Sequence, residues 1–123
     1  MLKEGLVYTS KVIVTLDNCA SAVGSGGLNV FATPSMVALM ENAAMNAVDP
    51  HLAEGQTTVG SHIETSHLKP SFIGTTVAAT ATLTAVEGRK LTFAIEAYEG
   101  ETLIGNGTHV RYIVSRDRFL NKR

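Results

Sequence analysis

The chain has 123 residues, of which 45% are hydrophobic and 17% charged, and its formal net charge is −1. This length fits one domain over residues 1–123, large enough to bury its own core. The near-neutral charge gives no reason to expect nucleic acid as a partner, and no apolar run approaches the ~20 residues that a membrane helix needs.

The N-terminal residues and the cysteine count bear on the compartment. Residues 1–6 contain an early acid, Glu4, and lack the apolar core of a signal peptide. Cys19 is the only cysteine, so neither an intrachain disulfide nor a cysteine metal cluster can form. A reducing compartment suits such a chain, and we expect it to be cytoplasmic.

A strand and a loop are predicted at the start of the chain. Residues 6–16 are rich in β-branched side chains, which favours a strand. Residues 17–30 predict a loop that Gly24, Gly26 and Gly27 keep pliable. These glycines lack the Lys-Ser/Thr of a P-loop and the full dinucleotide fingerprint. We therefore interpret the loop as a flexible lid or connector.

Residues 33–47 predict a helix that ends near Val48, before an Asp-Pro pair. Thr33 fits the N-cap because its side-chain oxygen can accept a bond from an unpaired backbone N–H, and Pro34 fits the next position. The apolar face has the three-four spacing of a helix and is formed by Met36, Leu39, Met40, Ala43, Ala44 and Ala47. Glu41 falls at the edge of this face, where a carboxylate either reaches solvent or is held half-buried for a purpose.

Four further strands are predicted, over residues 56–68, 75–86, 91–97 and 102–114. The middle two alternate apolar and polar residues, as half-buried strands do, with Leu83 and Ala85 on one face. Gly105 and Gly107 lie two apart on the last strand, where they allow a close approach to the backbone or mark a bend. One sheet of about five strands with one helix packed on it is an α+β domain. The wide apolar face of the helix favours a dimer that extends the sheet.

A search for catalytic motifs excludes several classes of enzyme. The chain has neither the Gly-x-Ser-x-Gly elbow of an α/β-hydrolase nor a His-Glu-x-x-His pair. Its histidines fall in different elements without metal-ligand spacing, so we expect no metal site: His51, His62, His67 and His109. The remaining candidates are a hydroxyl, a carboxylate and an imidazole: Thr33, Glu41 and His67.

Histidine is the default general base, but position on the strand decides its surroundings. His67 shares strand parity with Val59 and Ile63, so we expect it to face the helix. There it could act as a base, or it could be a core histidine bonded to a carbonyl. His62 shares parity with Gly60 on the opposite face, where a solvated side chain is expected.

Thr33 and Glu41 also have two interpretations each. A helix cap alone would explain Thr33, although the start of a helix can also stabilise an oxyanion. Thr33 and Glu41 are eight residues apart, which is ~12 Å along a helix axis. They can therefore act together only through His67 or with one of them supplied by a partner subunit.

Three segments resemble the hotdog-fold thioesterases, in particular the fluoroacetyl-CoA thioesterase-like branch. The first is the helix start from Ala32 to Val37, followed by Leu39-Met40-Glu41. The second and third are the strand from Val59-Gly60 to His67-Leu68-Lys69-Pro70 with Gly74, and the segment from Gly105 to Arg111. In this order and spacing the segments cover nearly all of residues 31–114.

This resemblance implies a sheet wrapped around a central helix, and a homodimer with sites at its interface that can pair further into a tetramer. It implies hydrolysis of an acyl-CoA thioester, with CoA as part of the substrate and no separate cofactor or metal. It carries over Thr33, Glu41 and His67 as the catalytic residues. It also suggests Gly60 as a backbone contact to the thioester and Arg111 as a contact near the substrate.

The lid differs from that of the branch. Fluoroacetyl-specific members carry phenylalanine in a lid before the helix, whereas residues 17–30 contain no aromatic side chain and only Phe31 comes close. We therefore expect Phe31 to contact the substrate, and the substrate to be another short- or medium-chain acyl-CoA. The segment from Arg111 to Arg123 is locally basic, and it could contact the phosphates of CoA.

Two mechanisms and several functions stay open at this stage. Either Thr33 attacks the thioester while His67 takes its proton and Glu41 orients His67, or His67 or Glu41 activates a water while Thr33 and backbone N–H groups bind the oxyanion. Threonine is a hindered nucleophile, which favours the water.

The main alternative function is a non-catalytic acyl-CoA-binding or sensing hotdog domain. A hydratase or dehydratase on this fold resembles a site with a histidine near the helix, which this helix lacks, and a purely structural role leaves Glu41 unexplained.

Overall fold

The computed structural model describes residues 2–121. Its strands, helices and 3-10 turns (η) are, in chain order, β1 (Val7–Ile13), η1 (Leu16–Asn18), α1 (Ala20–Val23), α2 (Thr33–Val48), η2 (Asp49–His51), β2 (Gln56–His67), β3 (Thr76–Glu87), β4 (Lys90–Glu99), β5 (Thr102–Ser115) and α3 (Arg116–Asn121). The order of one strand, a long helix and four strands is the predicted one. No helix in residues 2–121 is both long and apolar enough to cross a membrane.

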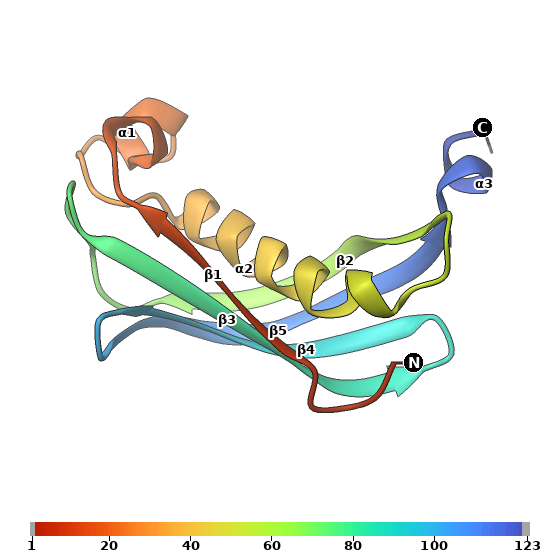
Figure 1. Ribbon diagram of the computed structural model, residues 1–123. Coiled ribbons are helices and arrows are strands. Elements are labelled where there is room, and N and C mark those ends of the chain that lie inside the picture. The colour runs from red at the N-terminus through yellow and green to blue at the C-terminus, as the bar shows by residue number, and fades with distance from the viewer. Residues whose placement is uncertain (1, 122–123) are drawn as a thin grey trace.

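The five strands form one antiparallel sheet in the order β1-β3-β4-β5-β2. Tight hairpins join β3 to β4 and β4 to β5, and each turn contains a glycine with positive φ, Gly88 and Gly100. β1 and β2 are the two edges. The helix α2 lies along one face of the curved sheet, with α1 beside its first turn and α3 near its far end (Figure 1). This arrangement confirms the α+β prediction.

The core lies between α2 and the sheet. The helix contributes most of the stripe that its spacing predicts, with Leu39 only half-buried and these residues buried: Met36, Met40, Ala43, Ala44, Ala47 and Val48. The sheet contributes alternate residues of β3 and β4, namely Val77, Ala79, Ala81, Leu83, Leu91, Phe93, Ile95 and Ala97. Burial of each large apolar side chain contributes about 1.5–3 kcal/mol, so this layer holds α2 firmly in place and fixes the position of its first turn.

The predicted close approach at Gly105 is confirmed. A Cβ at Gly105 would lie 2.6 Å from Sδ of Met36 and 2.9 Å from the carbonyl oxygen of Ser66. The α2 helix therefore packs directly onto the backbone of β5. This contact brings the start of α2 close to the end of β2.

The N-terminal strand and loop differ from the prediction. The strand expected over residues 6–16 ends at Ile13, because the chain turns at η1. The side chain of Asn18 accepts a hydrogen bond from the backbone N–H of Thr15 at 2.9 Å and donates one to the carbonyl of Ile13 at 3.1 Å. The loop expected over residues 17–30 contains α1. Local side-chain bonding of this kind competes with a strand and carries no periodic signal.

The predicted N-cap is also wrong. Ala32 takes the N-cap position, Thr33 is the first helical residue and Pro34 the second, and no side chain caps the helix. The hydroxyl of Thr33 is therefore not used in capping, and its actual partner is described below.

A bulge in β3 breaks the predicted alternation. Leu83 pairs with Phe93, whereas Ala85 pairs with the next residue back along β4, so Thr84 is unpaired. Val86 instead of Ala85 continues the core face behind the bulge.

Candidate active site

Thr33 and His67 form a hydrogen-bonded pair. Thr33 begins α2 and His67 ends β2, and Oγ1 of Thr33 lies 2.8 Å from Nδ1 of His67. His67 pairs with Gly105 of β5, the glycine that lets α2 approach the sheet. The fold thus joins a hydroxyl and an imidazole that are 34 residues apart in the chain.

The imidazole of His67 is held neutral. Burial lowers the pKa of His67 below its ordinary value, and the backbone of Lys69 raises it in part. Its Nε2 is buried and makes no hydrogen bond within residues 2–121. A hydroxyl that donates to Nδ1 assigns the proton of the neutral ring to Nε2. His67 is therefore bonded to the Thr33 hydroxyl, and with this tautomer it can accept a proton at Nδ1.

A cavity of about 270 Å³ opens beside this pair. It is lined by residues of α1 and the loop before α2, of the helix start and of the segment after β2: Ala20, Ser25, Val30, Phe31, Ala32, Thr33, His67, Leu68, Lys69 and Pro70. Phe31 is the aromatic side chain among these residues and is only 2% exposed. The predicted lid thus borders the cavity, and Phe31 forms part of its wall.

A bulge at Ser61 places Gly60 on the same face of β2 as His67. Gly60 pairs with Arg111, and the residue after Ser61 pairs with Val110. Two successive residues of β5 thus flank three of β2, so Ser61 has no opposite partner. The extra residue reverses the alternation of faces at this point.

The prediction of strand faces is wrong for this reason. Counting residues put Gly60 with His62 and put Val59 with His67. Counted through the bulge, Gly60 faces α2 with His67, whereas Val59 and His62 share the other face. His62 is exposed, as predicted.

Arg111 is held inside the protein by a network of hydrogen bonds. Its Nε donates to Oγ1 of Thr58 at 2.8 Å and its Nη2 to the carbonyl of Thr58 at 3.0 Å. Its Nη1 lies 3.2 Å from Nε2 of His109, and Nδ1 of His109 donates to the carbonyl of His62 at 2.7 Å. Arg111 is 7% exposed and His109 is 1% exposed. The planar guanidinium is therefore fixed in orientation.

The charges of this network follow from burial. Burial lowers the pKa of His109, with an opposing effect from the His62 carbonyl and a further lowering by the positive charge of Arg111. His109 is thus neutral, and its Nε2 accepts from the guanidinium. Burial also lowers the pKa of Arg111, while Glu41 and Asp49 raise it. A guanidinium stays charged under these conditions.

Glu41 lies with Gly60 and Arg111. A Cβ on Gly60 would be 3.0 Å from Oε2 of Glu41 and 3.4 Å from Nη1 of Arg111. These three residues line a second cavity, of about 420 Å³. Glu41 is more than two helical turns from Thr33, ~12 Å along the axis. One protomer therefore joins Thr33 to His67 but keeps Glu41 apart, in the neighbourhood of Gly60 and Arg111.

The sequence interpretation missed Thr58 and His109 as the residues that hold Arg111. The signal for His109 was available, since Gly105, Gly107, His109 and Arg111 alternate on one face of the last strand. Thr58 could not be found by alternation, because it lies beyond the bulge.

A comparison with protein families bears on this site. Residues 14–117 match the model of the family described as FlK, fluoroacetyl-CoA-specific thioesterase. The chain belongs to the fluoroacetyl-CoA-specific thioesterase family. A curated member, the fluoroacetyl-CoA thioesterase of Streptantibioticus cattleyicolor, is 41% identical over 90 residues, which are 73% of this chain and 65% of that protein. The chain thus spans just under two thirds of the length of this curated relative.

Solved structures agree with this family and its fold. A phenylalanine-to-alanine variant of the fluoroacetyl-CoA-specific thioesterase FlK superposes with a TM-score of 0.92 at 32% identity, over 99% of this chain and 95% of that one. A Thermus thermophilus protein described as a thioesterase superfamily member gives 0.88 at 29% identity, over 96% and 88% of the two chains. A hot-dog-like protein from Thermanaerovibrio acidaminovorans, 24% identical, gives a TM-score of 0.88 over 97% and 88%. The hotdog fold that the sequence motifs implied is confirmed.

Proposed function

We propose that this member of the fluoroacetyl-CoA-specific thioesterase family hydrolyses a short- or medium-chain acyl-CoA. Water adds to the thioester carbonyl, the carbon–sulfur bond breaks, and the products are a carboxylic acid and the thiol of CoA. The observation that carries the proposal is the 2.8 Å hydrogen bond between Thr33 and His67. It joins a hydroxyl to a neutral imidazole at a helix start, beside a cavity, in a chain of this family.

The chemistry needs a base and a site for negative charge. Neutral His67 is suited to remove a proton from an attacking water at Nδ1, once the Thr33 hydroxyl turns from that nitrogen toward the carbonyl oxygen of the substrate. The first turn of α2 presents backbone N–H groups without intrahelical partners, and these favour an oxyanion. Thr33 lies at this turn and can add its hydroxyl. A thiolate leaves readily, so protonation of the leaving group places little demand on the site.

Threonine as the nucleophile is the second version of the mechanism. The same hydrogen bond would let His67 take the proton of Thr33. A Thr33→Ala variant separates the versions. Loss of one oxyanion donor costs about 10²- to 10³-fold in kcat, whereas loss of the nucleophile stops turnover through an acyl-enzyme altogether. We favour the activated water, because the Thr33 hydroxyl is hindered.

In this proposal, the role of Glu41 depends on the oligomeric state of the protein. Because one protomer holds Glu41 apart from His67, a site that uses Thr33, Glu41 and His67 together needs a second copy of the chain. We propose a homodimer in which the long edge strand β2 pairs with its copy, so that the partner subunit's Glu41 completes the site. Gly60 and Arg111, which adjoin Glu41, would then contact the thioester part of the substrate.

The test is CoA release from a panel of thioesters: acetyl-, fluoroacetyl-, propionyl-, butyryl- and octanoyl-CoA. We expect turnover of the short members, and less than a tenfold preference for fluoroacetyl- over acetyl-CoA, because Phe31 is the aromatic residue at the cavity. His67→Ala should lower kcat by about 10²- to 10⁴-fold. His51→Ala removes an exposed imidazole of η2 that lines neither cavity, so it is the control and should keep the wild-type rate.

Two other outcomes would overturn the proposal. Acyl-CoA binding without CoA release, unaltered by His67→Ala, would identify a non-catalytic sensing domain. Equal losses in the His67 and His51 variants would show that the imidazole of His67 has no special part in the reaction.

A further inference from the structure

His109 is a buried imidazole with a partner at each ring nitrogen. Its Nδ1 lies 2.7 Å from the carbonyl oxygen of His62, and its Nε2 lies 3.2 Å from Nη1 of Arg111. A carbonyl oxygen only accepts, so the proton of the neutral ring is on Nδ1, and Nε2 is left as an acceptor. Because His62 follows the bulge at Ser61, the ring joins Arg111 to β2 at the point where that strand changes face.

The guanidinium of Arg111 is held with two of its N–H groups free. It has five N–H donors, of which two are bonded to Thr58 and a third to His109. In residues 2–121, one N–H on Nη1 and one on Nη2 are left without a partner. Arg111 lines the cavity of about 420 Å³ together with Glu41 and Gly60, so these two groups are the ones that it can offer to a thioester.

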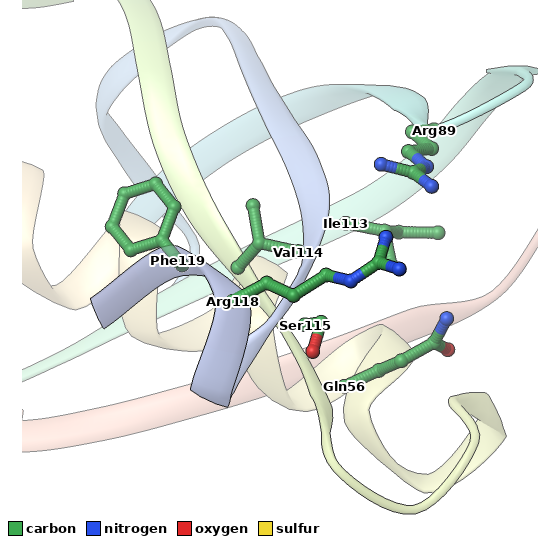
Figure 2. A pocket seen from close by; sticks show the side chains of 7 residues that line it. All are labelled: Gln56, Arg89, Ile113, Val114, Ser115, Arg118 and Phe119. Carbon is green, nitrogen blue, oxygen red and sulfur yellow. The ribbon is translucent and has the colours of Figure 1, made fainter. Parts of the chain in front are cut away.

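The arginines near the start of β2 have more freedom. Arg89 and Arg118 are exposed and line a pocket of about 190 Å³, into which their side chains extend from separate elements (Figure 2). An exposed arginine loses rotamer freedom when a ligand orders it. Arg111 is ordered in advance, so its free N–H groups are aimed before a substrate binds.

Arg111 is also kept from a neighbouring carboxylate. A Cβ on Gly60 would lie 3.0 Å from Oε2 of Glu41 and 3.4 Å from Nη1 of Arg111. Within residues 2–121 these two side chains nevertheless form no ion pair, although opposite charges attract and a guanidinium binds a carboxylate well. The bonds to Thr58 and His109 hold the guanidinium against this attraction. Both charges therefore remain available at the cavity.

We propose that His109 is a positioning residue, whose neutral ring aims the guanidinium of Arg111 into the cavity and keeps it from pairing with Glu41. This inference rests on the proposed hydrolase function, in which Arg111 contacts the thioester and Glu41 takes part in the reaction. Without the acceptor at Nε2, one anchor of the guanidinium is lost, and the small movement needed to pair with Glu41 becomes favourable. Such a pair would cover the backbone of Gly60 and withdraw both charges from the substrate.

The ring has to stay neutral for this role. Burial lowers the pKa of His109, the His62 carbonyl opposes this change, and the positive charge of Arg111 lowers the pKa further. The other titratable groups that act on the ring or on the guanidinium are Glu41 of α2, the side chain of His62 on β2 and Asp49 of η2. A second proton on the ring would remove the acceptor and place a positive charge against Arg111.

The first experiment compares His109→Phe with His109→Gln, using the fastest thioester of the panel. Phenylalanine keeps a ring but offers Arg111 no acceptor. Its kcat should fall about 10- to 100-fold, as it does when a group near the chemistry is misplaced by about 1 Å, and its KM should change less. Glutamine can donate to the His62 carbonyl and accept from Arg111, so His109→Gln should recover most of kcat. An equal loss in both variants would overturn the proposal.

Phe93→Leu is the matched control for packing. The ring of Phe93 lies 6.1 Å from that of His109, and Phe93 is buried on β4 outside the network. This variant should unfold at a lower urea concentration and keep the wild-type kcat. If it loses as much kcat as His109→Phe does, His109 acts only by filling the core, and the proposal is wrong.

The second experiment measures urea unfolding and needs no activity. Glu41→Gln should lower the midpoint more in the His109→Phe background than in the wild type, because Glu41 pairs with the released guanidinium only in that background. Equal effects in the two backgrounds would show that His109 does not separate the two charges.

The tautomer of His109 gives a third measurement. Proton–nitrogen NMR should show a neutral ring with its proton on Nδ1, and a proton on Nε2 would overturn the proposal because such a ring cannot accept from Arg111. If the wild type releases no CoA from any thioester, the proposed hydrolysis is wrong, while the unfolding and NMR measurements still decide whether His109 positions Arg111.

Discussion

Gly60 lies where the side chains of three other residues converge. A Cβ there would meet Oε2 of Glu41 at 3.0 Å, Cε1 of His109 at 3.2 Å and Nη1 of Arg111 at 3.4 Å. Two of these groups are fixed by hydrogen bonds, so they can give way only by weakening the network around Arg111. Glycine at this position therefore has a packing reason beyond conformational freedom.

We expect Gly60→Ala to lower the free energy of unfolding by about 1–2 kcal/mol, as moderate overpacking does, and to lower kcat/KM for a short acyl-CoA about tenfold. Denaturant unfolding and steady-state kinetics measure the two effects. Gly27→Ala is the control, because a Cβ at Gly27 would have no atom within 4 Å. A Gly60 variant that matched this control would contradict the crowding.

Two histidines, the buried His109 and the half-buried His67, set the sign of a pH dependence. Burial lowers the pKa of His67 and His109 from 6.5, so below that pH the unfolded chain binds more protons than the folded one. The free energy of unfolding contributed by these groups is therefore complete above about pH 7.5 and falls as the pH drops through 6.5. Urea titrations at about pH 7.5 and 5.5 should show lower stability at the acidic pH, and the difference should shrink in His109→Gln. An unchanged difference in that variant would contradict the assignment of His109.

The sequence predicted the roles of some site residues but not their positions. The sequence indicated Thr33 and His67 as partners in chemistry, because few residue types can act as nucleophile or base and these two remained. It could not show that Thr33 begins the helix instead of capping it, because both positions accept threonine. It also could not place Glu41 relative to His67, because helix spacing gives only the ~12 Å between Thr33 and Glu41, and the proposed dimer cannot be seen in one chain.

At the scale of elements, the pairing of β2 with β5 depends on Gly107. A Cβ at Gly107 would collide with the backbone of Glu64 and Thr65 on β2. A backbone cannot rotate away as a side chain can. At Gly105 one obstacle is the flexible end of Met36, so that site has more freedom to adjust.

Gly107→Ala should therefore destabilise the protein by about 3 kcal/mol or more, at the upper end for overpacking, and should expose β2 amides to hydrogen exchange. Gly105→Ala should cost less in the same unfolding measurement. The reverse order of the two variants would mean that the helix contact, and not strand pairing, limits this part of the sheet.

The elements themselves were largely predictable. The helix stripe and the alternation in β3 and β4 are strong periodic signals, and each matches a buried face in the structure. The errors occur where periodicity stops: at η1, where Asn18 bonds back to the strand, and at the bulges of β2 and β3. An extra residue in one strand leaves no mark in composition, so a count of alternate residues continues through it on the wrong face.

At the scale of the whole molecule, β2 is a long edge with half of its backbone groups unpaired. Such an edge is a template for another strand, and the proposed dimer would use it. His62→Asp tests this, because His62 is near the middle of the strand and the two carboxylates of a symmetric dimer would lie about 5 Å apart. We expect this variant to sediment near the 13.0 kDa of one chain and to lose CoA release.

The opposite edge gives the control. Thr9→Asp places the same charge on β1, which lies at the other side of the sheet. This variant should remain a dimer. If Thr9→Asp dissociates the assembly and His62→Asp does not, the two copies meet through β1, and the proposed composite site is wrong.

Because of the bulge at Ser61, the number of residues in β2 decides which of its side chains face α2. Side chains of a strand alternate between its two faces, and the extra residue Ser61 reverses this alternation once. Deletion of this one residue would leave Gly60 and His67 an even number of positions apart, so a regular strand without a bulge would keep both of them on the face of α2. Deletion of one residue elsewhere in β2, with the bulge in place, would instead turn one half of the strand over, so that either Gly60 or His67 would point to solvent. In related proteins, a change of one residue in the length of β2 should therefore occur only where this bulge is gained or lost.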